Sequence, residues 1–88
     1  MEKINEILNI LQEECAEVIQ VISKCRRFGI DNSHKDGITQ RQKLTQEIGD
    51  VSAMISLLID HGVVSVEDIE TAEQAKFAKL KLWSNIYN

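Results

Sequence analysis

Apolar residues recur every three or four positions along most of the chain, the spacing that places them on one face of an α-helix. This pattern predicts three helices, over residues 2–27, 39–61 and 65–87. The alternation of apolar and polar residues that would indicate β-strands is absent, and the sequence contains no proline. We therefore expect an all-α fold in one domain, residues 1–88, since this length allows a single domain.

Residues with turn and capping preferences mark the ends of these helices. Phe28-Gly29 ends the first helix, and residues 29–38 form a polar loop. Thr39, followed three residues later by Gln42, is a capping-box pattern that starts the second helix. The other boundaries are marked by His61-Gly62 and by Ser65 with Asp68.

The apolar surface of the first helix is wider than one small monomer can cover. Ile10 and Val21 extend its stripe around the helix. A chain of this size buries only about 60% of the surface that it exposes when unfolded. The extra face is either a wide core face or a subunit interface. We favour the interface and expect a homo-oligomer.

Charge and composition narrow the class of ligand. The net charge of −4 and the isoelectric point near 5.1 argue against a nucleic-acid polymer as partner. Cations nevertheless gather between residues 24 and 43 and near the end of the chain, while acids concentrate elsewhere. Such local cationic groups beside packed carboxylates favour a small anionic ligand. No apolar run approaches the roughly 18 residues that a membrane span needs, so no membrane partner is expected.

The two cysteines are predicted to be small core residues. Cys15 and Cys25 lie ten residues apart in one helix, which separates them by about 15 Å along its axis, too far for a disulfide. The N-terminus carries acids in place of the basic segment of a secretory signal. These features predict a cytoplasmic protein.

Four carboxylates interrupt the apolar stripes of the first two helices. Glu14 lies within the first stripe and Glu17 follows one turn later, while Glu47 lies within the second stripe and Asp50 follows one turn later. Spacing of i, i+3 places the members of each pair side by side. If both faces turn inward, four negative charges converge in a partly dry space. That arrangement is unfavourable unless some carboxylates are protonated or a cation binds.

A divalent cation would relieve this repulsion. Oxygen ligands without nearby cysteine or histidine favour Mg²⁺ or Mn²⁺ over zinc. A di-iron site is excluded, because it needs Glu-x-x-His and neither histidine follows a glutamate by three residues. The alternative of solvated surface acids applies best to Glu13, which points away from the stripe. For Gly49, between the two acids of the second helix, we favour close helix packing over close approach of a ligand.

The two acidic motifs together resemble a known signature. Residues 13–17 read EECAE, which fits EExxE, and residues 47–50 read EIGD, which fits ExxD. In this order on consecutive helices, they resemble the MazG-like all-α nucleoside triphosphate pyrophosphohydrolases. The likeness spans most of the chain, including the basic stretch SKCRRFG and the lysine-rich third helix. The ending LKLWSNIYN looks like that of members carried by bacteriophages, which would place the protein in the host cytoplasm.

The resemblance implies a reaction, a cofactor and an assembly. Such enzymes use Mg²⁺ to hydrolyse a nucleoside triphosphate between its α- and β-phosphates, which gives the monophosphate and pyrophosphate. Carried over residue by residue, Glu14, Glu17, Glu47 and Asp50 match the metal ligands, and Glu17 is a candidate general base. Family members build the site at a dimer interface, often in a dimer of dimers. We therefore expect a dimer of the four-helix-bundle type and a homotetramer, with the dimer as the smaller alternative.

The residues that would contact phosphate are less narrowly defined. The candidates are cations at one-turn spacing near the ends of the first and third helices: Lys24, Arg27, Lys76 and Lys79. Surface cations often serve only solubility. The loop over residues 28–38 is a candidate lid, and nothing in the pattern indicates which base is bound. A catalytically inactive, metal-stabilised dimer that acts as a binding module is the alternative function; the presence of all four carboxylates favours the enzyme.

Overall fold

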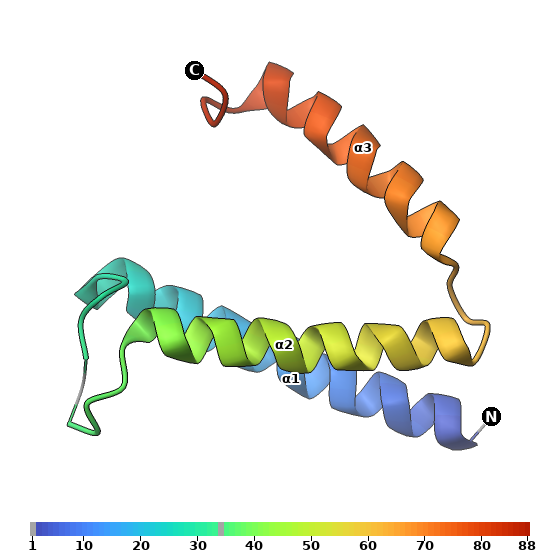
Figure 1. The fold of residues 1–88 in the computed structure, drawn as a ribbon, viewed down its shortest axis with the longest axis horizontal. Coiled ribbons are helices and arrows are strands. Elements are labelled where there is room, and N and C mark those ends of the chain that lie inside the picture. The colour runs from blue at the N-terminus through green and yellow to red at the C-terminus, as the bar shows by residue number, and fades with distance from the viewer. Residues whose placement is uncertain (1, 34) are drawn as a thin grey trace.

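The computed structural model describes residues 2–33 and 35–88 and consists of three helices joined by two loops (Figure 1). Helix α1 spans Glu2–Phe28, one residue beyond its predicted end, α2 spans Gln40–Asp60 and α3 spans Val66–Trp83. The described residues form no strand; an isolated backbone bridge pairs Ser33 with Thr39. The expected all-α fold is confirmed.

The capping interactions expected at the helix ends are present. The Thr39 hydroxyl accepts a hydrogen bond from the Gln42 backbone N–H at 3.1 Å, and the Gln42 side chain accepts one from the Thr39 backbone N–H at 2.8 Å. His61 closes α2, and Gly62 follows with φ of 72°, a conformation that favours glycine. The Ser65 hydroxyl caps α3. Each end is thus fixed by residues close in sequence.

Helix α3 ends at Trp83, short of the predicted residue 87. Ser84 stops it, because both its hydroxyl and its backbone N–H donate to the carbonyl of Leu80, at 2.7 and 3.0 Å. Ile86 and Tyr87 therefore lie beyond the helix and do not continue its apolar stripe.

Helices α1 and α2 pack side by side and antiparallel, whereas α3 extends away from them (Figure 1). The buried side chains of the described residues are Ile7 and Val21 of α1 and Gln40 and Leu58 of α2. None of the residues of α3 is buried. The core of a single chain is therefore the seam between two helices. Periodicity predicts an apolar face on α3 but not the surface that covers it.

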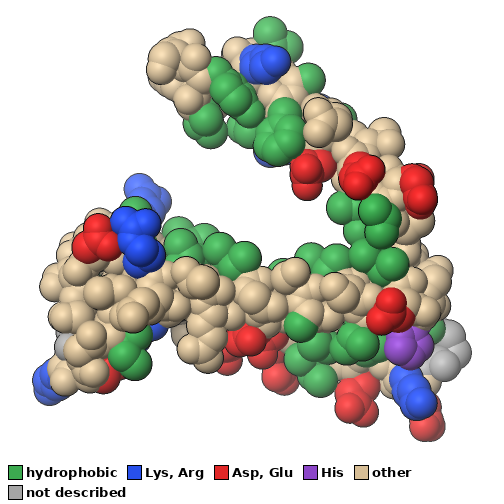
Figure 2. Space-filling view, viewed as in Figure 1, with side chains coloured by type: hydrophobic (Ala, Val, Ile, Leu, Met, Phe, Trp, Pro, Cys, Tyr) green, Lys and Arg blue, Asp and Glu red, His purple; other side chains and the backbone are tan. Residues whose placement is uncertain are grey.

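Large apolar side chains are exposed on all three helices. Ile19 on α1 is 68% exposed and Trp83 at the end of α3 is 83% exposed. Figure 2 shows apolar side chains along the faces of α1–α2 and α3 that border the gap between them. Helix α1 thus exposes excess apolar surface as predicted, and α3 shares it, but the residues differ: Val21, expected on the extra face, is buried, whereas Ile19 is exposed.

The cysteines have different environments. Both are free, but Cys15 is exposed and Cys25 is half-buried. The expectation of two core cysteines is therefore wrong for Cys15 in the single chain. Helix α2 covers the face of α1 that carries Ile7 and Val21, and Cys15 lies outside it.

None of the helices in the described part of the chain has the continuous apolar length that a bilayer span requires.

Candidate metal centre

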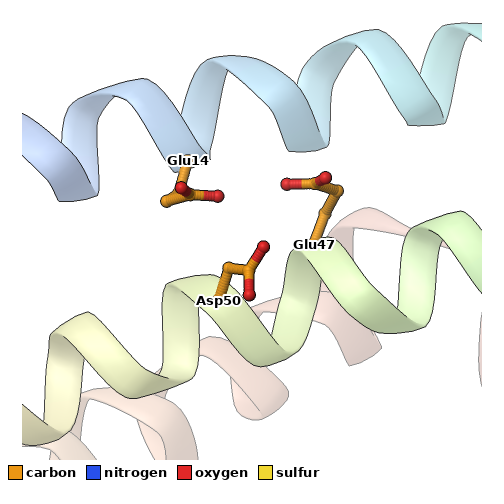
Figure 3. A group of neighbouring side chains, drawn as sticks. All are labelled: Glu14, Glu47 and Asp50. Atoms are coloured by element: carbon orange, nitrogen blue, oxygen red, sulfur yellow. The ribbon is translucent and has the colours of Figure 1, made fainter.

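Three carboxylates from two helices converge at the middle of the α1–α2 seam (Figure 3). Glu14 points from α1 toward α2, and Glu47 and Asp50 point from α2 toward α1. One oxygen from each lies within 4.8 Å of the other two, and all three side chains are half-buried. The seam therefore presents a set of oxygen ligands with no sulfur or nitrogen in the group.

Helix geometry produces this arrangement. The two acids of α2 are three residues apart, so both face the same side, and the antiparallel partner brings Glu14 to them from across the seam. Gly49 lies between them, and a Cβ placed there would meet nothing within 4 Å. Close packing within the chain, which we favoured for Gly49, therefore does not explain it.

The cluster holds more negative charge than its surroundings compensate. Glu14 Oε2 and Glu47 Oε2 are buried and have no hydrogen-bond partner among the described residues. Among the described residues the ion pairs are Arg41 with Asp31 and Lys43 with Asp36, and both lie outside the cluster. The site thus contains buried acceptor oxygens without a donor, which a cation would satisfy.

The crowding of negative charge raises the pKa values of two carboxyls. Hydrogen bonding to the Glu17 carboxyl, burial and the charges of Glu17 and Glu14 raise the pKa of Glu47 to about 7. Burial, followed by the charges of Glu17 and Asp50, raises the pKa of Glu14. A proton or a metal ion is therefore favoured at this position over a set of bare carboxylates.

Glu17 lies at the margin of the group. Its side chain is exposed and does not belong to the three carboxylates whose oxygens lie within 4.8 Å of one another, although its carboxyl raises the pKa of Glu47. Nothing in the pattern of residues separates Glu17 from the other three candidates. Glu13 is exposed, in agreement with its predicted position away from the stripe.

The residues present fit a hard divalent cation. Carboxylate oxygens are the ligands that Mg²⁺ and Mn²⁺ prefer, and Mg²⁺ usually binds one or two carboxylates while retaining waters and substrate phosphates. The two orphaned oxygens and the mutual proximity of the three carboxylates are the observations on which this fit rests.

The cationic candidates are not gathered at the carboxylates of the same chain. Lys24 is half-buried, and Arg27 lies over the Phe28 ring at 5.1 Å; both line a shallow depression near the end of α1. Lys76 and Lys79 are exposed on α3, which extends away from the seam. A phosphate role for these four residues stays a prediction.

Two ion pairs, which sequence reasoning missed, join the loop between α1 and α2 to the first turns of α2. The Arg41 guanidinium donates to both carboxylate oxygens of Asp31, at 2.8 and 3.1 Å. The Lys43 ammonium lies 3.2 Å from Asp36. Arg41 lowers the pKa of Asp31, whereas the pKa of Asp36 is lowered first by the hydrogen bond from the Ile38 backbone N–H and then by Lys43. The sequence signal that could have revealed these ion pairs is the presence of two acids in the loop, Asp31 and Asp36, shortly before two cations, Arg41 and Lys43.

Comparison with known proteins agrees with this geometry. The profile of the MazG nucleotide pyrophosphohydrolase domain matches residues 2–81, nearly the whole chain. The chain belongs to the MazG nucleotide pyrophosphohydrolase family. The chain is also 32% identical over 74 residues to "Uncharacterized protein YvdC" of Bacillus subtilis (strain 168), which covers 82% of this chain and 70% of that protein. No solved structure matches.

The MazG match covers both acidic motifs and most of α3. The resemblance drawn from EExxE and ExxD is thereby confirmed at the level of the family. The three carboxylates that converge in Figure 3 belong to those two motifs.

Proposed function

We propose that this MazG chain hydrolyses a nucleoside triphosphate between its α- and β-phosphates, with Mg²⁺ as cofactor and Mn²⁺ as a substitute. The products would be the nucleoside monophosphate and pyrophosphate. The observation that carries the proposal is the set of Glu14, Glu47 and Asp50, whose oxygens lie within 4.8 Å of one another, in a chain of a pyrophosphohydrolase family.

Residues of the chain would bind the metal ion and accept a proton. Glu14, Glu47 and Asp50 would hold the ion, and their anchorage on two packed helices keeps their spacing fixed. Bound Mg²⁺ would neutralise phosphate charge and lower the pKa of a water. Glu17, exposed at the margin and acting on Glu47, would complete the ligand set or accept the proton of the attacking water.

A second copy of the chain would complete the molecule. The exposure of Ile19 on α1 and of Trp83 on α3 supports an assembly that covers both helices. We propose a homotetramer of two dimers, with the dimer as the smaller alternative. We propose Lys76 and Lys79, which are exposed on α3, as phosphate ligands that a second copy would bring to the carboxylates. Lys24 and Arg27 would act from the end of α1.

The proposal is tested by product analysis. The protein is incubated with each common ribo- and deoxyribonucleoside triphosphate and Mg²⁺, and the phosphorus products are separated. We expect pyrophosphate and monophosphate from at least one substrate, and no turnover in excess EDTA. Stepwise release of orthophosphate would show that another bond is cut. Metal binding without turnover of any substrate would favour the inactive binding module.

A further inference from the structure

A groove continues the carboxylate seam toward the N-terminus of α1. It has a volume of about 360 Å³ and is lined by residues of both helices: Lys3, Glu6, Ile7, Ile10, Met54, Leu57 and His61. In Figure 2 apolar side chains lie between the acidic group at the lower edge of α1–α2 and the histidine near the N-terminal end. A groove of this size is within the range of small-ligand sites.

The groove and the metal centre share one helical register. From Glu14, steps of four, three and four residues toward the N-terminus of α1 reach Ile10, Ile7 and Lys3. The same steps from Asp50 toward the C-terminus of α2 reach the facing residues, listed in order as Met54, Leu57 and His61. Because the helices are antiparallel, both series of residues run in the same direction along the seam. The groove therefore begins one turn from the carboxylates.

The lining changes from apolar to polar along its length. Ile7 is 7% exposed and forms the floor, Ile10 and Met54 are half-buried, and Leu57 is 37% exposed at the edge. Lys3, Glu6 and His61 are exposed at the far end. An apolar trough with a few polar groups at its end suits a flat heterocycle that stacks on aliphatic side chains and carries hydrogen-bonding edges.

The ring of His61 supplies one defined polar atom. Its Nδ1 lies 2.9 Å from the carbonyl oxygen of Leu57, which can only accept, so Nδ1 carries the hydrogen in this contact. In the neutral ring Nε2 is then an acceptor that is available to a ligand. An amino or imino N–H of a nucleobase is the matching donor.

We propose that the groove over residues 3–10 and 54–61 binds the sugar and base of the nucleoside triphosphate, and that His61 contributes to base selection. The proposal rests on the proposed function, which places the phosphates at the carboxylates. Ile7 lies seven residues from Glu14, about 10 Å along the helix, so a nucleoside can extend into the groove from phosphates held at the metal centre. A second copy of the chain as occupant is an outcome that the experiment separates.

The experiment measures binding without turnover. Titration calorimetry with Mg²⁺ compares inorganic tripolyphosphate, which has no nucleoside, with α,β-imido nucleoside triphosphates of the common bases. Leu57→Trp fills the groove from an exposed position, and Leu8→Trp is the matched control, since Leu8 is 43% exposed on α1 and does not line the groove. Melting and sedimentation of each variant confirm fold and assembly.

We expect the parent to bind at least one imido nucleotide roughly tenfold or more tighter than tripolyphosphate, because the groove buries apolar surface of the nucleoside. Leu57→Trp should remove most of that advantage while it leaves tripolyphosphate affinity within about twofold, and Leu8→Trp should change neither. His61→Ala should reduce the differences in affinity among the bases.

The outcomes separate this inference from the proposed reaction. Equal binding of imido nucleotides by the parent and Leu57→Trp would overturn the groove assignment and leave the reaction standing. A change in oligomeric state in Leu57→Trp, with nucleotide affinity unchanged, would identify a second copy as the occupant. Groove-dependent nucleotide binding without pyrophosphate release would overturn the reaction alone. Failure of both probes to bind would overturn both.

Discussion

Glu14 and Glu47 approach each other from facing helices, and each keeps one buried carboxylate oxygen without a hydrogen-bond partner among the described residues. Two acceptors in this position repel each other and have lost contact with water. The pair stays in place because the packing of α1 on α2 holds it there, and its geometry would suit a cation without rearrangement of the helices.

Removing the charge of Glu47 tests whether this residue binds the metal ion or only supports the fold. Glu47→Gln keeps the size of the side chain, but it should lower turnover by orders of magnitude, since an amide is a poor substitute for a carboxylate at Mg²⁺. The metal-free variant should melt at the same temperature as the parent or higher, because a repelling charge is gone. Steady-state kinetics and melting curves test both.

Glu13→Gln is the matched control for this variant. Glu13 is exposed and lies outside the oxygen set, so its substitution should change neither property appreciably. Mg²⁺ should raise the melting temperature of the parent and of Glu13→Gln, and should raise that of Glu47→Gln much less. An active Glu47→Gln enzyme with a full Mg²⁺-dependent shift would show that Glu47 is not a ligand.

The stability of the metal-free protein should fall as pH rises. The folded protein raises the pKa of Glu47 from 4.5 to about 7, so it binds this proton more tightly than the unfolded chain does. The resulting stabilisation is fully present below about pH 4.5 and is lost as pH rises through about 7. Melting in EDTA across this range measures the effect, and Glu47→Gln should show a smaller fall. A parent melting temperature that rises from pH 5 to 7.5 would contradict the assignment.

Gly49→Ala should stabilise the protein. Glycine in a helix interior costs about 1 kcal/mol relative to alanine, and the added methyl group has open space. Denaturant unfolding should therefore show an increase of about that size with turnover unchanged. A stabilised but inactive variant would indicate that a ligand or a second copy approaches the backbone at this point.

Self-association should be required for a stable fold. Sedimentation should give a dimer or tetramer, and Trp83→Asp should shift it toward the single chain, because a charge replaces an 83% exposed indole on the surface that we expect a partner to cover. A stable, active 10 kDa species would rule out the assembly.

The parts of the fold that were predicted depend on neighbours in sequence. Thr39 and Gln42 define the start of α2 through contacts that span three residues. Glu14, Glu47 and Asp50 were recognisable as candidates because a charge inside an apolar stripe is unfavourable without a partner, and the structure brings their oxygens together.

The parts that were missed depend on how the helices meet. Spacing along α1 pairs Glu17 with Glu14, but the packing of α1 on α2 decides which of them enters the oxygen set. Gln40 is 1% exposed at the first position of α2, and its burial follows from packing that no local pattern encodes. Periodicity predicts an apolar face on α3 but not where the helix lies, and in the single chain α3 buries none of its residues.

Because α3 has no buried side chain in the single chain, the proposed assembly would make its folding depend on concentration. An eighteen-residue helix without buried side chains is marginal in water, since most helical stability in proteins comes from tertiary packing. Its amide hydrogens should therefore exchange with solvent faster than those of α1 and α2, and the exchange should slow as protein concentration rises. In dilute solution we then expect a helical hairpin with a frayed third helix, so that expression level would set how much of the polypeptide is structured.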